Sequence, residues 1–142
     1  MLTTGEFSGF ETVRYEGPQS ETALAYRWYD AGRVVMGRPL GEHLRFAVAY
    51  WHSFVMNGAD PFGAPTIRRG WMAEGDAMTM ARAKADAAFE FFRILDVPFF
   101  CFHDRDVVAE DDSLAGTLRR LEEMTAYLGR KMESSRTKLL WG

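Results

Sequence analysis

The feature that most constrains the fold is a regular alternation of strand-length and helix-length segments after residue 43. Apolar runs of strand length lie at 44–51, 99–103 and 137–141. A long Gly- and Pro-containing loop at 57–75 follows the first run, and a helical pattern precedes each of the other two. The order strand, loop, helix, strand, helix, strand predicts an α/β protein built of parallel βαβ units with right-handed crossovers.

Both helices carry start signals and apolar periodicity. The first is predicted to begin after an N-cap at Asp76 and to end before Asp96 and Pro98. Its apolar positions at 81, 85, 88, 89, 92 and 95 keep the spacing of one helical face. The second is predicted from about Ser113, and its apolar stripe consists of Leu114, Leu118, Leu121, Leu128 and Met132.

The pattern divides the chain into two parts. Residues 1–43 are interrupted by Gly and Pro and are predicted to be an extension that packs on something else. Residues 44–142 are predicted to form the first βα units of an incomplete domain. Three parallel strands leave two open sheet edges and an uncovered face, so the chain resembles the opening of a larger architecture.

Charge and composition exclude several classes of function. Seventeen basic and twenty acidic residues leave a formal charge of −3, and the basic residues are scattered, so neither nucleic acid nor an anionic membrane is an expected partner. No apolar run approaches the roughly 18 residues of a membrane span, and Met1 is followed by a polar stretch rather than a leader. The single cysteine, Cys101, lies in an apolar run, which fits a reducing cytoplasm.

Aromatic and imidazole side chains stand at the predicted strand ends. In parallel α/β folds functional groups gather at the carboxyl ends of strands, which here are Trp51, His103 and Trp141. We therefore expect an imidazole and two indoles to meet on one rim. Flat aromatic walls around a polar group suit a sugar, although tryptophans at strand ends are more often core residues.

His103 is followed three residues later by Asp106. A carboxylate that accepts the proton of one ring nitrogen fixes the tautomer and makes the other nitrogen a better base. The alternative is a surface turn with ordinary solvated charges. We assign His43 and His52 to structural roles. The sequence holds no HExxH motif, no Cys/His cluster and no nucleotide-binding glycine motif.

The run AAFEFFRILDVPFFCFHDRD, which ends at Asp106, resembles the larger, extended class of xylose (glucose) isomerases. The resemblance continues in order along the chain, at 15–18, 42–46, 49–54, 60–63, 81–84 and 138–142. It implies the amino-terminal part of a TIM-type (β/α)8 barrel, with about three strands and two helices. It also implies a homotetramer that interconverts D-xylose and D-xylulose, and glucose and fructose, in the cytoplasm.

The resemblance also assigns roles to individual residues. His103 is expected to bind the ring-oxygen end of an aldose substrate and to assist ring opening, with Asp106 holding it. Trp51 and Trp141 are expected to wall the sugar, and Phe62 to reach into the active site of a neighbouring subunit. The family performs a hydride shift assisted by two divalent ions (Mg, Mn or Co), whose ligands are expected beyond residue 142.

One departure from the family follows the histidine segment. Relatives read close to A-P-E-G-D where this chain has Val-Ala-Glu-Asp-Asp at 108–112. Losing the proline and glycine predicts a looser turn behind His103.

Three interpretations follow. The first is a fragment of a full-length isomerase, inactive alone because the metal ligands are missing. The second is a naturally short, non-catalytic chain that binds sugars or associates with full-length subunits. The third is another metal-dependent barrel enzyme acting on sugars, which would have to explain the segments at 49–54 and 102–106 together.

Overall fold

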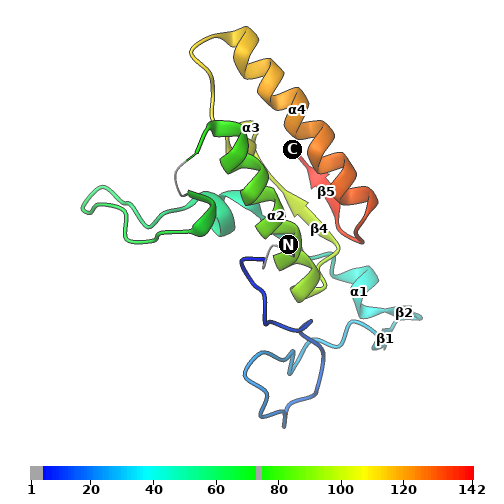
Figure 1. The fold of residues 1–142 in the computed structure, drawn as a ribbon. Coiled ribbons are helices and arrows are strands. Elements are labelled where there is room, and N and C mark those ends of the chain that lie inside the picture. The colour runs from blue at the N-terminus through cyan, green and yellow to red at the C-terminus, as the bar shows by residue number, and fades with distance from the viewer. Residues whose placement is uncertain (1–4, 73–74) are drawn as a thin grey trace.

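The computed structural model describes residues 5–72 and 75–142, and its centre is a three-stranded parallel sheet (Figure 1). The strands β3 (Ala47–Ala49), β4 (Phe99–Cys101) and β5 (Lys138–Trp141) pair in chain order. The predicted α/β class and the parallel order of the strands are confirmed. The sheet is open at β3 and at β5, so these strands do not close a barrel.

The predicted strand at 44–51 is too long. Only Ala47–Ala49 is extended, and Trp51–Val55 forms the short π-helix η1. The reason lies in Tyr50 and Phe54, which are both buried with ring centroids 5.1 Å apart. In a strand these two side chains would stand about 13 Å apart, at roughly 3.3 Å per residue. A helical turn brings both rings into one core.

The predicted strand at 99–103 is also too long, because β4 ends at Cys101 and His103 begins a helical turn. The short helix α3 (Asp104–Val107) follows His103, whose backbone N–H donates to Asp106 Oδ2 at 2.8 Å. The first backbone N–H groups of a helix have no carbonyl partner within the helix. A carboxylate in the first turn that accepts the N–H of the residue before the helix satisfies one of them. This bond turns the chain away from the sheet at His103.

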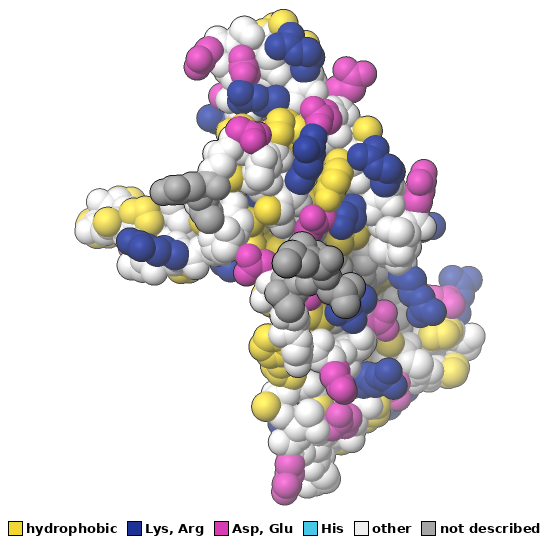
Figure 2. All heavy atoms as spheres, viewed as in Figure 1, with side chains coloured by type: hydrophobic (Ala, Val, Ile, Leu, Met, Phe, Trp, Pro, Cys, Tyr) yellow, Lys and Arg dark blue, Asp and Glu magenta, His cyan; other side chains and the backbone are white. Residues whose placement is uncertain are grey.

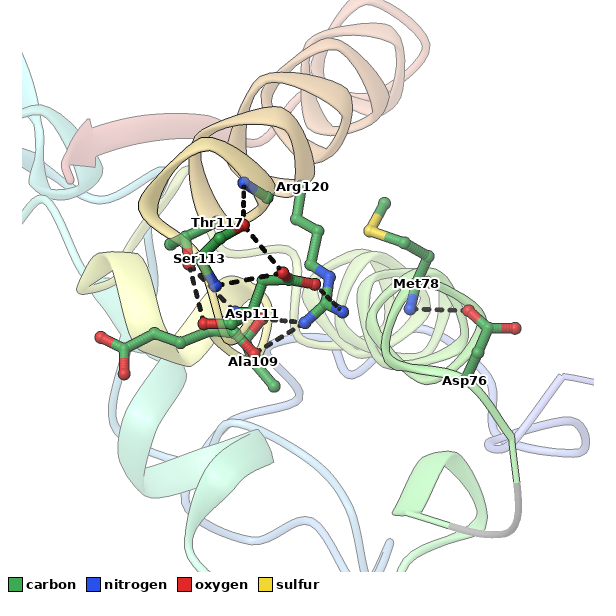
Figure 3. Close-up of polar contacts among 9 residues, drawn as sticks. Asp76, Met78, Ala109, Asp111, Ser113, Thr117 and Arg120 are labelled. Atoms are coloured by element: carbon green, nitrogen blue, oxygen red, sulfur yellow. Dashed lines mark hydrogen bonds and ion pairs between the residues drawn. The ribbon is translucent and has the colours of Figure 1, made fainter.

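Helix α2 (Ala77–Leu95) begins and ends as predicted. The Asp76 side chain accepts hydrogen bonds from the backbone N–H groups of Met78 and Thr79, the first of which is drawn in Figure 3. Asp96 closes the helix in the left-handed conformation, with φ of 50°. The buried face carries Ala81, Ala85, Ala87, Ala88, Phe89, Phe92 and Ile94. Phe92 and Phe100 of β4 are stacked at 5.2 Å, which joins the helix to the sheet.

Helix α4 (Leu114–Glu133) begins after Ser113, which accepts a hydrogen bond from Gly116 N–H, as expected for an N-cap. The predicted stripe is buried only in part: Leu128 lies in the core, and Leu121 and Met132 pack against it. Leu114 and Leu118 are 76% and 56% exposed, whereas Met124 and Leu128 are buried in the core. The first turns of α4 extend past the start of α2, and both exposed leucines lie in these turns (Figure 1).

The extension is mostly irregular, with a small hairpin of β1 (Val34–Val35) and β2 (Arg38–Pro39) before the short helix α1 (Leu40–His43). It packs on α2 of the same chain. The Val13 N–H donates to Ile94 O at 2.7 Å, and the Tyr26 hydroxyl donates to Leu95 O at 2.7 Å. Residues 1–4 of the predicted extension and residues 73–74 of the predicted loop lie outside the described residues.

The turn at 108–112 is bonded to α4. The guanidinium group of Arg120 donates to the carbonyl oxygens of Ala109 and Glu110 at 3.2 and 2.6 Å, and it pairs with the Asp111 carboxylate at 2.5 Å (Figure 3). Val108 is buried in the core.

Positive and negative side chains are interspersed on the face drawn in Figure 2, without a basic patch. Among the described residues, every helix is too short or too polar to cross a bilayer.

We predict that the Asp76 cap makes stability depend on pH in the acidic range. The hydrogen bonds from Thr79 lower the pKa of Asp76 from its ordinary value of 3.8. Its contribution is therefore complete above 3.8 and is lost as the pH falls through the lower pKa of the folded state. Asp76→Asn keeps a capping oxygen without titrating, so we expect it to lose less stability on acidification.

Urea unfolding monitored by circular dichroism between pH 7 and pH 2 measures this difference. Glu122→Gln, on the exposed face of α4, is the control. Equal pH dependence of the unmodified chain and Asp76→Asn would contradict the prediction.

Candidate functional site

Three rings from three different elements meet at one rim of the sheet. Trp51 follows β3, His103 follows β4, and Trp141 ends β5. The His103 ring lies 4.6 Å from the Trp51 ring and 5.5 Å from the Trp141 ring, and the two indoles are 5.5 Å apart. The structure thus brings together the three strand-end residues that the sequence placed on one rim.

The carboxylate of Asp106 contacts the imidazole ring of His103. The His103 Nδ1 and Asp106 Oδ2 atoms are 3.0 Å apart, and the same oxygen accepts the His103 backbone N–H. Because an ionised carboxylate only accepts hydrogen bonds, this contact assigns the ring proton to Nδ1 and leaves Nε2 as the bare nitrogen of the neutral ring.

Asp106 and His103 differ in their exposure to solvent. The Asp106 residue is only 8% exposed, whereas the His103 side chain is 60% exposed. A buried carboxylate is not part of an ordinary solvated turn, so the surface-turn alternative does not describe this pair. Within this chain Trp141 is 47% exposed and Trp51 is half-buried. The rim is an open, aromatic-walled surface with one fixed imidazole.

Phe62 lies apart from this rim. It is 97% exposed at the tip of the loop between η1 and α2, which projects from the rest of the chain (Figure 1). The Asp60 carboxylate accepts the Phe62 N–H at 2.7 Å, and Asp60 and Gly63 form an isolated bridge. These bonds give the loop tip a defined turn, while the ring of Phe62 is left without neighbours to cover it.

The two remaining histidines are outside the cluster of His103, Trp51 and Trp141. His43 Nε2 lies 2.9 Å from Val35 O and so ties α1 to the small hairpin. His52 is exposed and contacts Trp51 at a ring distance of 5.6 Å.

Two polar residues near Asp106 were not identified from the sequence. Tyr50 is fully buried, and its hydroxyl has no hydrogen-bond partner among the described residues. Burial raises the pKa of Tyr50, and the charges of Asp86 and Asp106 raise it further. The Lys84 ammonium lies 5.8 Å from the centre of the Tyr50 ring. The sequence signal that could have identified Lys84 is its place among the buried positions 81, 85 and 88 of α2.

The described residues do not fit a two-metal site. Nowhere in 5–72 or 75–142 do three or more His, Cys, Asp or Glu side chains gather where they could hold a metal ion. At the rim, Asp106 directs its Oδ2 to His103 and is buried. One such carboxylate and one imidazole are too few ligands for divalent ions that prefer six or more oxygens.

Comparison with known proteins identifies one group of relatives. The chain is 54% identical over 136 residues to the xylose isomerase of Dinoroseobacter shibae, 47% identical over 136 residues to that of Caldicellulosiruptor bescii, and 50% identical over 141 residues to that of a Chelativorans species. These matches cover 96–99% of the chain but only 31–32% of each relative. No protein-family model matches the chain. The chain is therefore homologous to xylose isomerases over nearly its whole length and spans about a third of theirs.

Proposed function

From this homology to xylose isomerases, we propose that the chain supplies the sugar-binding and ring-opening part of an aldose–ketose isomerase acting on xylose. Residues 44–142 would form the first three βα units of its TIM-type barrel, and residues 1–43 the extension that packs on them. The observation that carries the proposal is the His103 ring, which is held at Nδ1 by a buried carboxylate and lies against two indoles.

The rim suits a pyranose. Indole faces bind the apolar C–H faces of a sugar ring, and Trp51 and Trp141 stand 5.5 Å from each other beside the imidazole. The bare Nε2 of His103 accepts a hydrogen bond from a sugar hydroxyl. The resemblance to xylose isomerases implies that the ring-oxygen end of the sugar would lie against His103.

Ring opening requires one proton to leave the hydroxyl on C1 and one proton to reach the ring oxygen, while the bond from C1 to the ring oxygen breaks and a carbonyl forms. Both oxygens are bonded to C1, so one nitrogen can reach both. In our proposal Nε2 takes the hydroxyl proton and returns it to the ring oxygen. The Asp106 carboxylate stabilises the imidazolium that forms between these transfers.

The rim residues do not explain the metal chemistry, the oligomeric assembly or the cellular location of such an enzyme. The family uses two divalent ions, but the described residues do not fit such a site, so we derive no step of the isomerisation from them. A homotetramer, a place for Phe62 in a neighbouring subunit and a cytoplasmic location are expectations from the resemblance. The exposure of Phe62 on a projecting loop is consistent with a place for its ring in a neighbouring subunit.

A chimeric enzyme tests the proposal. The 136-residue segment of the Dinoroseobacter shibae enzyme that aligns with this chain is replaced by the chain itself, and xylulose formation is measured with added Mg²⁺, Mn²⁺ or Co²⁺. We expect turnover within about tenfold of the parent enzyme, because half of the segment is identical and the rim residues are intact. A folded chimera without turnover on xylose would contradict the proposal.

A sugar-binding or subunit-associating chain without catalysis is the second candidate. It is favoured by the fact that the indoles, the imidazole and its carboxylate all lie within this chain. Xylose binding to the chain without turnover in the chimera would support this candidate.

A further inference from the structure

The start of the extension lies against the base of the loop between η1 and α2. The half-buried Phe7 ring packs on the Trp71 ring of the short 3₁₀-helix η2 (Gly70–Met72) at 6.5 Å, and on the Phe91 ring of α2 at 5.5 Å. The Phe7 N–H donates to Glu90 Oε2 at 3.1 Å. Phe7 therefore joins α2 to the segment in which the loop ends.

Two glycines make room for this close approach. A Cβ atom at Gly70 would collide with the Glu6 carboxylate, and a Cβ atom at Gly5 would collide with the Glu90 carboxylate. The extension passes this close to η2 and α2 because neither position carries a side chain.

Trp71 also joins the two ends of the loop. Its indole N–H donates to the Phe54 carbonyl oxygen at 2.9 Å, and the two rings are 5.9 Å apart. Phe54 lies in η1, where the loop begins, whereas Trp71 lies where it ends. Trp71 is only 5% exposed, so this hydrogen bond is shielded from water. A contact that fixes Trp71 thus fixes the base of the loop.

The loop itself is a narrow finger held by its own hydrogen bonds. The N–H groups of Thr66 and Ile67 donate to the Asn57 carbonyl oxygen at 3.0 and 2.9 Å, which pairs the outgoing and returning halves of the loop. At the tip the Asp60 carboxylate accepts the Phe62 N–H. Because the two halves are bonded to each other, the direction in which Phe62 points depends on the base.

We propose that Phe7 is a positioning residue for the loop 57–69. Its ring keeps Trp71 in place, and Trp71 fixes the direction in which the loop presents Phe62. The extension thereby orients a distant side chain as well as packing on α2. The importance of Phe62 for an active site rests on the proposed function, but the effect of Phe7 on the loop is measurable without any sugar.

The test measures the direction of the loop as the distance between two spin labels in the 142-residue chain. One label is placed near the loop tip in Ala64→Cys, and the other on the exposed face of α4 in Glu122→Cys. Cys101 is buried, so it stays unlabelled. Without further substitution we expect one narrow distribution of distances. In Phe7→Ala we expect the distribution to become at least about twofold wider, because the base of the loop loosens and the tip moves with it.

Phe10→Ala is the matched control, since it removes a ring that is 51% exposed from the same segment. Its distribution should be as narrow as that of the chain with Phe7 and Phe10 intact. Phe7→Tyr keeps the ring and should also give a narrow distribution. An unchanged width in Phe7→Ala would overturn the proposal, and so would equal broadening in Phe7→Ala and Phe10→Ala.

Phe7→Leu covers the case in which Phe7→Ala does not fold, as judged by circular dichroism. Leucine keeps an apolar side chain against Trp71 but loses the aromatic ring. Its distribution should therefore be wider than that of Phe7→Tyr. Equal widths in these two variants would refute the role of the ring.

In the chimeric enzyme, Phe7→Ala is expected to raise the KM for xylose about threefold or more and to change kcat by less than about twofold. The reason is that a displaced Phe62 weakens sugar binding and leaves His103 untouched. Phe10→Ala should change neither constant. A wider distance distribution in Phe7→Ala with an unchanged KM would support the role of Phe7 and count against the place of Phe62 in the proposed function.

Discussion

Replacing His103 by asparagine in the chimeric enzyme is expected to lower turnover of cyclic xylose by about 10²- to 10⁴-fold, the usual contribution of a positioned acid–base group. Asparagine keeps a polar side chain at the rim but cannot carry a proton from the C1 hydroxyl to the ring oxygen. A short aldose such as glyceraldehyde has too few carbons to close a ring and bypasses this step. We expect its turnover to fall less than about threefold.

The comparison of the two substrates separates ring opening from general damage to the site. His52→Asn is the matched control, because His52 is exposed beside Trp51 and outside the contacts of His103. It should leave both substrates unaffected. An equal loss of turnover on xylose and on glyceraldehyde in His103→Asn would rule out the ring-opening role, since both substrates would then need His103 for a later step.

The 142-residue chain without the rest of an isomerase is expected to show no conversion of xylose to xylulose, which means loss of the whole enzymatic rate enhancement of about 10⁶-fold or more. The sheet is open at β3 and β5, and the described residues hold no cluster of three metal ligands. Ring opening alone does not move hydrogen between sugar carbons. In our proposal the rim residues of the chain alone still bind the sugar.

The assay follows xylulose formation by the purified chain with Mg²⁺, Mn²⁺ or Co²⁺, alongside calorimetric titration of each ion. The His103→Asn chain, purified in the same way, controls for contaminating host isomerase. Turnover that persists in the unmodified chain but not in the His103→Asn chain, or a two-ion isotherm with micromolar affinity, would contradict the expectation. Either result would mean that the metal-binding residues are present in this chain.

The sequence by itself determined the architecture and most of the rim. Helix α2 was predictable because its N-cap at Asp76, its apolar period and its stop at Asp96 are signals between residues close in the chain. The alternation of such segments indicated parallel strands. The carboxyl ends of parallel strands lie at the same edge of the sheet. That rule places His103, Trp51 and Trp141 close together. The roles of these residues in catalysis stay predictions.

Only the tertiary structure decided where the elements end and which side chains face each other across elements. Trp51–Val55 became a π-helix because Tyr50 and Phe54 share one core, and Leu114 and Leu118 stayed exposed because α4 extends past α2. These outcomes depend on neighbours distant in sequence.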